Sequence, residues 1–448
     1  MRRLFILAAL AAACGSVKHP GDGDGDSSDD DGGVSCTPGE PLSCQGDSIV
    51  VCGDDGMSQR TVGCDISCDP DTLSCTCEPD TSVCEEGIES VCGSDGHATP
   101  QSCPLGCFDD TRCADLDATN RLTQFLDEAA GGPDLVLTDG TIIDTDSQEI
   151  IVDGLPINVT PVLLEAPADP GGIQVLVFAV SSLTMNGDVI TRGRRALAFV
   201  SDGNIAVNGI VRVLAGPGVD GTGGGDNLVV CDPGPPAFGH ISGRGGGGFG
   251  GRGGKGGDIT GEITGGAGGA IVGNAEIVPL RGGGQDPSFL GAGGALQLVS
   301  RTRITIADGG ALHAGGLAGM DNRTGGSAGG GVVLEAPVVE VAGAIAANGG
   351  GGGCGGGSMI TSSAEDGRLD DQRAAACQSD DNGDGGKGGA GSTPNGLPGQ
   401  DITGCPVVAG QGGGGVGRIR ISNAGGDFAP EGSAIISPPA TVSTVGRR

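Results

Sequence analysis

Cysteine is the residue type whose spacing in this chain points most directly to chemistry. The 448 residues include 17 cysteines, and a thiol can join a disulfide, bind zinc or act as a nucleophile. Cys14 stands apart, twelve lie between Cys36 and Cys113, and four are dispersed over the second half. Those four are Cys231, Cys354, Cys377 and Cys405. Without Cys14 the number is even, which indicates disulfides formed in an oxidising compartment.

The twelve crowded cysteines repeat one pattern twice. The first copy has Cys36, Cys44, Cys52, Cys64, Cys68 and Cys75, and the second has Cys77, Cys84, Cys92, Cys103, Cys107 and Cys113. The third cysteine of each copy lies in Val-Cys-Gly-x-Asp-Gly. Each copy is too short for a self-sufficient apolar core, so we predict three disulfides per copy, with their pairing open. Zinc is the alternative for the Cys-x-x-x-Cys pairs, but the lack of nearby histidine favours disulfides.

The first fourteen residues have the pattern of a bacterial export signal. Met1-Arg2-Arg3 is basic, Leu4 to Leu10 is apolar but too short to span a bilayer, and three alanines precede Cys14. Small residues followed by Cys are similar to a lipobox, although its leucine would usually occupy position 11 and here occupies position 10. We predict a signal peptide over 1–13 and a lipid on Cys14 that binds the membrane. The alternative is a simply secreted protein with an unpaired thiol.

An acidic segment separates this signal from the cysteine modules. Residues 14–35 include the run GDGDGDSSDDDGG and have almost nothing to bury, which predicts a disordered, extended tether. Clustered carboxylates also suit calcium. However, no spacing typical of an EF-hand occurs here, and the second acidic run, Asp380 to Asp384, favours a solvated loop. We therefore predict no metal site and no cofactor.

Composition restricts both the core and the partners. The chain has 95 glycines, no tryptophan, no tyrosine and a net charge of −32. Nucleic acid is excluded as an expected partner because phosphate binding requires clustered Lys and Arg. The missing Trp and Tyr also remove the usual platforms for stacking sugars. A core must be built from Val, Ile, Leu and Ala, which suits short stacked strands.

Residues 135–448 contain an internal repeat of short apolar strands. Leu183 and Ile205, Met185 and Val207, and Gly187 and Gly209 are each 22 residues apart. Further copies begin at 296 and 332, and a partial copy begins at 417. Three strands per 22 residues predict a parallel β-helix with an aliphatic core. A β-sandwich is the alternative fold. We expect Asn208-Gly209 to form a corner with positive φ.

Long glycine-rich insertions interrupt this repeat. Residues 216–294, 315–330 and 349–415 all follow the third strand of a turn, so we expect them to leave at one corner and form one flank. Such tracts are either disordered or packed as extended, polyproline-like chains. Two disulfides among the four dispersed cysteines would restrain them. The domain organisation is thus modules at 36–75 and 76–113, a linker at 114–134 with a short helix over Asn120 to Ala130, and the β domain.

No catalytic constellation emerges from the remaining motifs. Glycine patterns like GxGxxG do not open a helix, and Lys255 and Lys387 lie in GGKGG without the following Ser or Thr of a phosphate loop. The histidines, His19, His97, His240 and His313, are scattered. Exposed strand positions are expected to be Thr, Asn, Ala and Gln, whereas a polysaccharide lyase or hydrolase needs convergent charged groups.

The overall layout is similar to the predicted surface lipoproteins of myxobacteria. The similarity rests on the lipobox, the DGDGD tether, the tandem six-cysteine modules and the glycine-rich β domain. It implies an exported protein at the outer membrane or cell surface. We predict a non-catalytic adhesive or matrix protein with a surface protein or polysaccharide as partner. The alternatives are a β-helix polysaccharide lyase or hydrolase and a cysteine-module binder or inhibitor.

Overall fold

The computed structural model describes residues 36–53, 56–64, 67–94, 96–165, 174–213, 242–259, 264–284, 291–319, 324–355, 360–380, 383–403 and 408–448. The predicted signal peptide and tether lie outside these ranges. The described chain is mainly β, as predicted, and divides into two compact units. One contains residues up to Pro79 and Ser94–Thr99, and the other contains Asp80–Gly93 and Pro100–Arg448. Residues of the second cysteine module belong to both units.

The first unit consists of short antiparallel strands joined by disulfides. β1 (Pro41–Gln45), β2 (Ser48–Cys52) and β3 (Gln59–Gly63) form one sheet. β4 (Ser67–Asp69) pairs with β5 (Ser74–Thr76), which pairs with the start of β8 (His97–Ser102). The apolar core of β2 is only Ile49, Val50 and Val51. So small a core explains why covalent links are needed.

The second unit begins with two short hairpins and a small helical segment. The hairpins are β6 (Ser82–Glu85) with β7 (Ile88–Cys92), and β9 (Cys107–Asp109) with β10 (Arg112–Cys113). β11 (Leu116–Asp117) pairs with the last strand, β34 (Gly446–Arg447). The helix expected from Asn120 is shorter than predicted and consists of η1 (Leu122–Phe125) and α1 (Leu126–Ala130). Asn120 and Arg121 have φ of 55° and 63°, which no right-handed helix accommodates.

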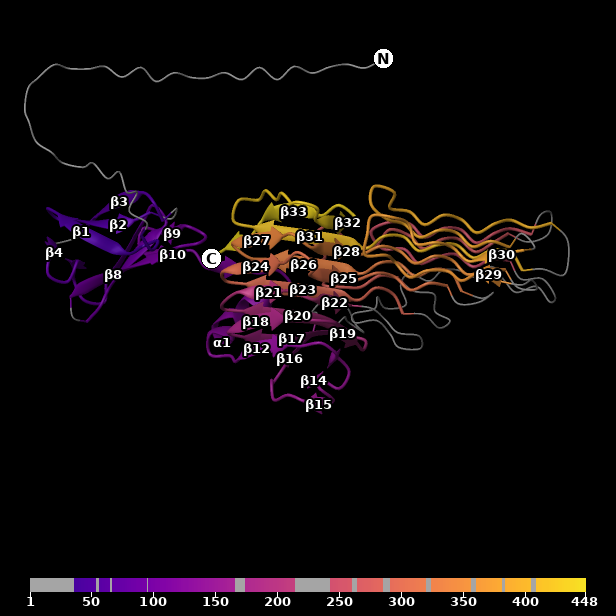
Figure 1. Cartoon of the computed structure of the whole chain (residues 1–448), viewed down its shortest axis with the longest axis horizontal. Coiled ribbons are helices and arrows are strands. Elements are labelled where there is room, and N and C mark those ends of the chain that lie inside the picture. Colours follow the sequence, from indigo (N-terminus) through magenta and orange to yellow (C-terminus); the bar gives the residue numbers. More distant parts are fainter. Residues whose placement is uncertain are drawn as a thin grey trace, which may run out of the picture. The chain divides into compact units, whose positions relative to one another are not determined.

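Three sheets then wind into a parallel β-helix, whose strands are stacked coil upon coil in Figure 1. The five-stranded sheet contains β12 (Asp134–Leu137), β18 (Ser182–Met185), β21 (Ile205–Val207), β24 (Arg303–Ile306) and β27 (Val338–Val341). The eight-stranded sheet contains β15 (Leu155–Pro156), β14 (Glu149–Val152), β13 (Thr141–Asp144), β19 (Val189–Arg192), β22 (Ile210–Arg212), β25 (Ala311–His313), β28 (Ala344–Ala346) and β32 (Ile435–Ser437). The seven-stranded sheet contains β16 (Val162–Glu165), β17 (Gln174–Val180), β20 (Ala196–Ser201), β23 (Ala295–Ser300), β26 (Gly331–Glu335), β31 (Arg418–Asn423) and β33 (Thr441–Thr444).

The register between coils confirms the repeat read from the sequence. Leu183 lies opposite Ile205, and Met185 lies opposite Val207, in parallel strands of the five-stranded sheet. Such parallel pairing of successive coils rules out the β-sandwich. Alternate side chains point inward and stack with their counterparts in the next coil. Phe178 and Phe199, for example, stack with ring centroids 5.4 Å apart. The result is one continuous aliphatic core inside the three sheets.

The corner at Gly209 differs from its prediction. Its φ is not positive, and the positive value of 83° belongs instead to Gly187 one coil earlier. Glycine is needed at 209 because a Cβ there would lie 2.0 Å from the carbonyl oxygen of Gly187. Close stacking of two coils, not backbone conformation, therefore selects this glycine.

All three glycine-rich insertions leave the β-helix at one corner, as predicted. Each begins after a strand of the eight-stranded sheet (β22, β25 or β28) and returns to the seven-stranded sheet (β23, β26 or β31). Their described parts run outward side by side from that corner in Figure 1, as far as the small hairpin of β29 (Ile360–Ser362) and β30 (Gln378–Ser379). The three insertions therefore form one structure.

Candidate functional site

The described parts of the insertions form an ordered bundle of extended chains. We call it the glycine bundle; it comprises residues 242–259, 264–270, 314–319, 324–330, 347–355, 364–377, 383–403 and 408–417. Of the two states open from the sequence, the packed one is present over these residues. Backbone hydrogen bonds join different segments, and few lie within one segment. This is the bonding expected of polyproline-like chains, which have no internal hydrogen bonds.

The segment 410–417 shows how the chains pack. Its backbone is hydrogen-bonded to six other stretches, namely 244–247, 254–257, 326–329, 350–353, 386–389 and 394–400. Residues three apart bond to the same neighbour: Gly412 N donates to the Arg244 carbonyl at 2.8 Å, and Gly415 N donates to the Gly247 carbonyl at 2.9 Å. A period of three residues is that of a polyproline-like helix. The segment is thus surrounded on all sides by other chains.

Glycine is required because these backbones approach more closely than a side chain allows. A Cβ at Gly413 would lie 2.2 Å from the Lys387 carbonyl oxygen, and one at Gly246 would lie 2.1 Å from that of Gly413. Side chains occur where a chain faces outward, in a Gly-Gly-x pattern such as Arg252, Lys255 and Asp258. This period of three in the sequence is the signal that predicts the packed, polyproline-like state.

A disulfide restrains the outer part of the bundle. Cys354 and Cys377 are bonded, and both are buried. This is one of the two disulfides expected among the dispersed cysteines. Cys231 and Cys405 lie outside the described residues. The bond joins the segment 347–355 to the chain that continues into β30, so the bundle is held by a covalent link as well as by backbone hydrogen bonds.

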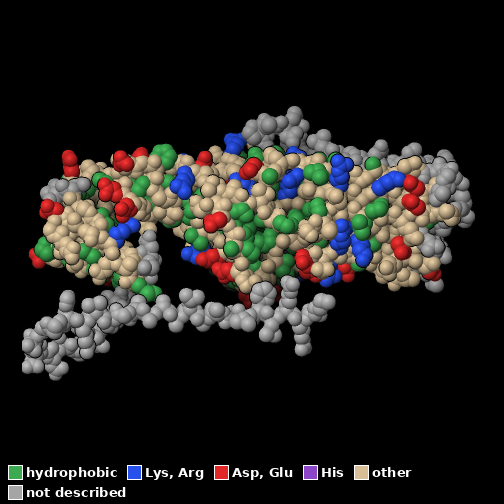
Figure 2. Space-filling model, turned by 90° about the horizontal axis from the view of Figure 1, so that it is seen from above, with side chains coloured by type: hydrophobic (Ala, Val, Ile, Leu, Met, Phe, Trp, Pro, Cys, Tyr) green, Lys and Arg blue, Asp and Glu red, His purple; other side chains and the backbone are tan. Residues whose placement is uncertain are grey.

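Three cations lie around the bundle segment Pro394–Leu397. The Asn395 amide oxygen accepts a hydrogen bond from Arg252 N at 2.8 Å, and the Asn395 carbonyl accepts one from Arg373 Nη1 at 3.1 Å. Leu397 N donates to the Lys387 carbonyl at 2.8 Å. Arg252 and Lys387 are exposed, and Arg373 is half-buried. We call Arg252, Arg373 and Lys387 the cation strip; Figure 2 shows several Lys and Arg side chains on the part of the surface that belongs to the bundle.

The cysteine modules form disulfides in the same order. The first copy pairs Cys36 with Cys52, Cys44 with Cys68 and Cys64 with Cys75. In the second copy Cys84 pairs with Cys107 and Cys103 with Cys113, while Cys77 and Cys92 are also in disulfides. Two groupings resemble metal sites, Cys84 with Cys103 and Cys107, and Glu89 with Cys103 and Cys113. Their cysteines are oxidised, which removes the thiolates that zinc would need.

The isolated polar residues of the sequence have structural roles where they are described. His97 Nδ1 is 2.8 Å from Ser74 Oγ, and His313 Nε2 is 2.6 Å from the Gly367 carbonyl. Burial lowers the pKa of His313. Asp384 accepts a hydrogen bond from Ser379 N. His19, His240, Asp381 and Asn382 lie outside the described residues, as do Cys14 and the acidic tether.

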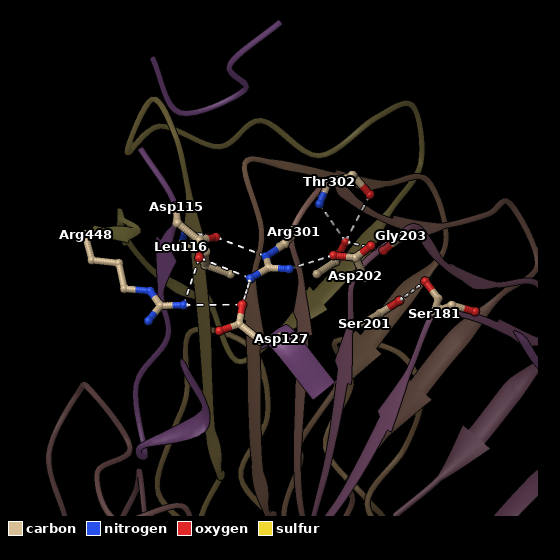
Figure 3. Close-up of polar contacts among 11 residues, drawn as sticks. Asp115, Leu116, Asp127, Ser181, Ser201, Asp202, Gly203, Arg301, Thr302 and Arg448 are labelled. Atoms are coloured by element: carbon tan, nitrogen blue, oxygen red, sulfur yellow. Dashed lines mark hydrogen bonds and ion pairs between the residues drawn. The ribbon is translucent and has the colours of Figure 1, made fainter. Parts of the chain in front are cut away.

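A cluster of ion pairs holds the end of the chain against the β-helix (Figure 3). Arg301, between β23 and β24, contacts Asp115 at 3.1 Å, Asp202 at 2.8 Å and Asp127 at 2.5 Å. Arg448 also contacts Asp115, at 2.8 Å. Burial opposes ionisation of Asp115, but hydrogen bonds from Arg301, the Leu116 amide and Arg448 hold its pKa below the ordinary value. The cluster joins Asp115, Asp127 and Arg448 to the β-helix through Arg301.

A second polar cluster is buried on the outer side of the seven-stranded sheet. Glu335 accepts hydrogen bonds from Thr119 Oγ1 at 2.9 Å and Gln297 Nε2 at 2.7 Å, and it pairs with Arg420 at 3.2 Å. Gln297, which we expected to be exposed, is fully buried because Thr119 and Asn120 cover it. Burial raises the pKa of the Glu335 carboxyl, against the opposing charge of Arg420. The cluster fixes the helical segment to the sheet.

The charged residues along the strands also differ from expectation. Besides Thr and Ala, the outer faces present pairs of opposite charge, such as Arg192 with Asp144 at 2.8 Å and Arg303 with Glu340. Arg212, the last residue of β22, contacts Asp188, which directly precedes β19, at 2.9 Å. Each of these carboxylates is therefore bonded to a guanidinium group.

Comparisons with known proteins identify no relatives. Models of protein families, curated proteins and solved structures all gave no match to this chain. Within the part that the structure describes, no helix has the length and apolar character to cross a membrane. The disulfides of both units indicate an exported protein.

Proposed function

We propose that this protein is a non-catalytic, lipid-anchored surface or matrix protein whose glycine bundle contacts neighbouring molecules. The observation that carries the proposal is the bundle itself: three insertions leave one corner and pack into one ordered body. Maintaining so many ordered glycines is costly in chain entropy. A loop that only connects two strands does not need to be ordered. The order of the bundle therefore favours a role as a contact surface.

Its position outside the cytoplasm has independent support. Disulfides occur in the cysteine modules and in the bundle, and the residues up to Cys14 have the pattern of a lipoprotein signal. The layout also resembles predicted surface lipoproteins of myxobacteria. The acidic segment after Cys14 would then separate the folded units from the membrane.

The paired charges on the β-helix favour this role over a lyase or hydrolase. Glycoside cleavage requires two carboxylates that both face the substrate. Asp144, Asp188 and Glu340 are each bonded to an arginine. Such pairs stabilise neighbouring coils of a β-helix, and they leave these carboxylates unsuited to act as acid and base.

The anchoring is tested by membrane fractionation and intact mass of the native protein and a Cys14→Ala variant. We expect native protein in the membrane fraction with the mass of an added lipid, and the variant in the soluble fraction. Native protein that is soluble and carries no lipid would contradict the anchor. A Cys231→Ala variant serves as the control, because it removes a cysteine outside the signal and should remain in the membrane fraction.

A further inference from the structure

We propose that the cation strip binds an anionic polysaccharide through its carboxylate or sulfate groups. This inference rests on the proposed role of the glycine bundle as a contact surface. The starting point is that Arg252 and Lys387 have no hydrogen bond or ion pair from their side chains to any described residue. Arg373 uses one nitrogen to contact the carbonyls of Gly388 and Asn395, at 3.1 Å each, and none to contact a described carboxylate.

Unpaired cations are unexpected in this chain. The net charge is −32, with 56 Asp and Glu against 24 Lys and Arg, so acidic partners are abundant. Many other arginines and lysines of the second unit use them: Lys255 binds Asp258 at 2.6 Å, and Arg368 binds Asp370 at 2.7 Å in the same bundle. Arg121, Arg418 and Arg447 are bonded to carbonyl oxygens instead. Three neighbouring cations without a carboxylate partner are therefore available to an external anion.

The bundle fixes the backbone positions from which these cations extend. The Asn395 side chain and carbonyl bond to Arg252 and Arg373, and the Leu397 amide bonds to Lys387. The carboxylates nearest to Lys387 and Arg373 along the chain are bonded elsewhere. Asp384, one turn before Lys387, accepts a hydrogen bond from Ser379 N, and Asp371, two residues before Arg373, accepts one from Gln372 Nε2. The backbone of Arg252 and Lys387 is thus fixed on either side of Pro394–Leu397, and the Arg373 guanidinium is held directly, while the Arg252 and Lys387 side chains extend into solvent.

The surface chemistry favours a polysaccharide over a nucleic acid. Single-stranded nucleic acids bind through aromatic side chains on which the bases stack. The one aromatic side chain of the glycine bundle, Phe249, is fully buried and offers no such platform. Instead, Pro394 and Leu397 are exposed between the cations, with Leu397 42% exposed. They offer a small apolar surface for the carbon face of a sugar ring. Extended chains repeat a side-chain position every three residues, or about 9 Å, which suits a linear polymer with regularly spaced charges.

Binding of the full chain to a soluble polyuronate and a sulfated polysaccharide tests the proposal, measured by calorimetry at low and high salt. The informative variant is the double substitution Arg252→Gln and Lys387→Gln, which removes the two exposed cations of the strip. Its control is Lys255→Gln with Arg368→Gln, which removes the same charge from the same bundle at cations that already have carboxylate partners. We expect wild-type protein to bind one or both polymers, with at least about a tenfold loss of affinity in the first variant and little loss in the control.

Three results would overturn the inference: no binding of either polymer by wild-type protein, equal losses in both variants, or equal binding of single-stranded DNA. Neutral dextran should not bind. The two polyanion arms separate carboxylate from sulfate recognition. Because membrane fractionation is independent of this assay, a wild-type protein that is anchored but binds no polyanion contradicts only this inference. A soluble protein that binds the polymer contradicts only the anchor.

Discussion

At the scale of single residues, Glu335 and Arg420 show how a buried polar group is tolerated. Their side chains are 3% and 7% exposed, and Thr119 and Gln297 complete the hydrogen bonds of the carboxylate. Arg420, the cation paired with Glu335, also pairs with Glu276 at 2.9 Å. Without Arg420, Glu335 would be buried without a counterion. The pair therefore specifies how the helical segment docks on the seven-stranded sheet.

Replacing Arg420 by methionine should destabilise the second unit strongly. We expect a loss of about 3–5 kcal/mol, because Glu335 would remain buried without a cation. The measurement is the free energy of unfolding in urea. The control is Arg303→Met, which removes the half-exposed partner of Glu340 and should cost less than about 1 kcal/mol. Similar losses in the two variants would show that burial does not distinguish these pairs.

At the scale of elements, the glycine bundle depends on backbone contacts that leave no room for a methyl group. The segment 410–417 is bonded to six other stretches, so it cannot move away from one neighbour without approaching another. This differs from an ordinary loop, where an added side chain turns toward solvent. The packing therefore makes single glycines as sensitive to substitution as core residues are in a globular domain.

A Gly413→Ala substitution should loosen the bundle while the β-helix remains folded. The new Cβ would lie 2.2 Å from the Lys387 carbonyl oxygen, and overpacking of this kind typically costs about 1–3 kcal/mol. Hydrogen exchange of the bundle amides measures the effect. Gly131→Ala is the control, because its φ is −97° and the nearest atom to a Cβ there is 3.9 Å away. Unchanged protection in the Gly413 variant would contradict the packing described.

At the scale of the whole molecule, the two units are stabilised in different ways. The first has few buried apolar residues and three described disulfides within residues 36–75. The second has an aliphatic core that runs through all coils of the β-helix. A small domain without its disulfides usually cannot offset the conformational entropy of its chain. The β-helix has no such dependence.

Reduction should therefore unfold the first unit selectively. We expect limited proteolysis under reducing conditions to cut residues 36–79, while the β-helix strands stay protected and the chain keeps its far-ultraviolet circular dichroism. Mass spectrometry of the fragments locates the cuts, and unreduced protein is the control. If the β-helix strands became accessible at the same concentration of reductant, its apolar core would not be sufficient for its stability.

Much of the fold was accessible from the sequence because it depends on local repetition. The 22-residue spacing of Leu183 and Ile205 predicts their pairing, since equal coils place equivalent residues side by side. The duplicated cysteines likewise predict disulfides, and the position of each insertion after a third strand predicts a common corner. These inferences need only the distance along the chain between similar residues.

Tertiary structure decided what depends on segments far apart in the chain. Three features have no local signal: the pairing of Cys44 with Cys68, the burial of Gln297 under Asn120, and the meeting of the cation strip around Pro394–Leu397. The same holds for the choice between disordered and packed glycine tracts. A single tract has no partner for its backbone groups, and only the arrival of six neighbours from distant parts of the chain makes the ordered state favourable.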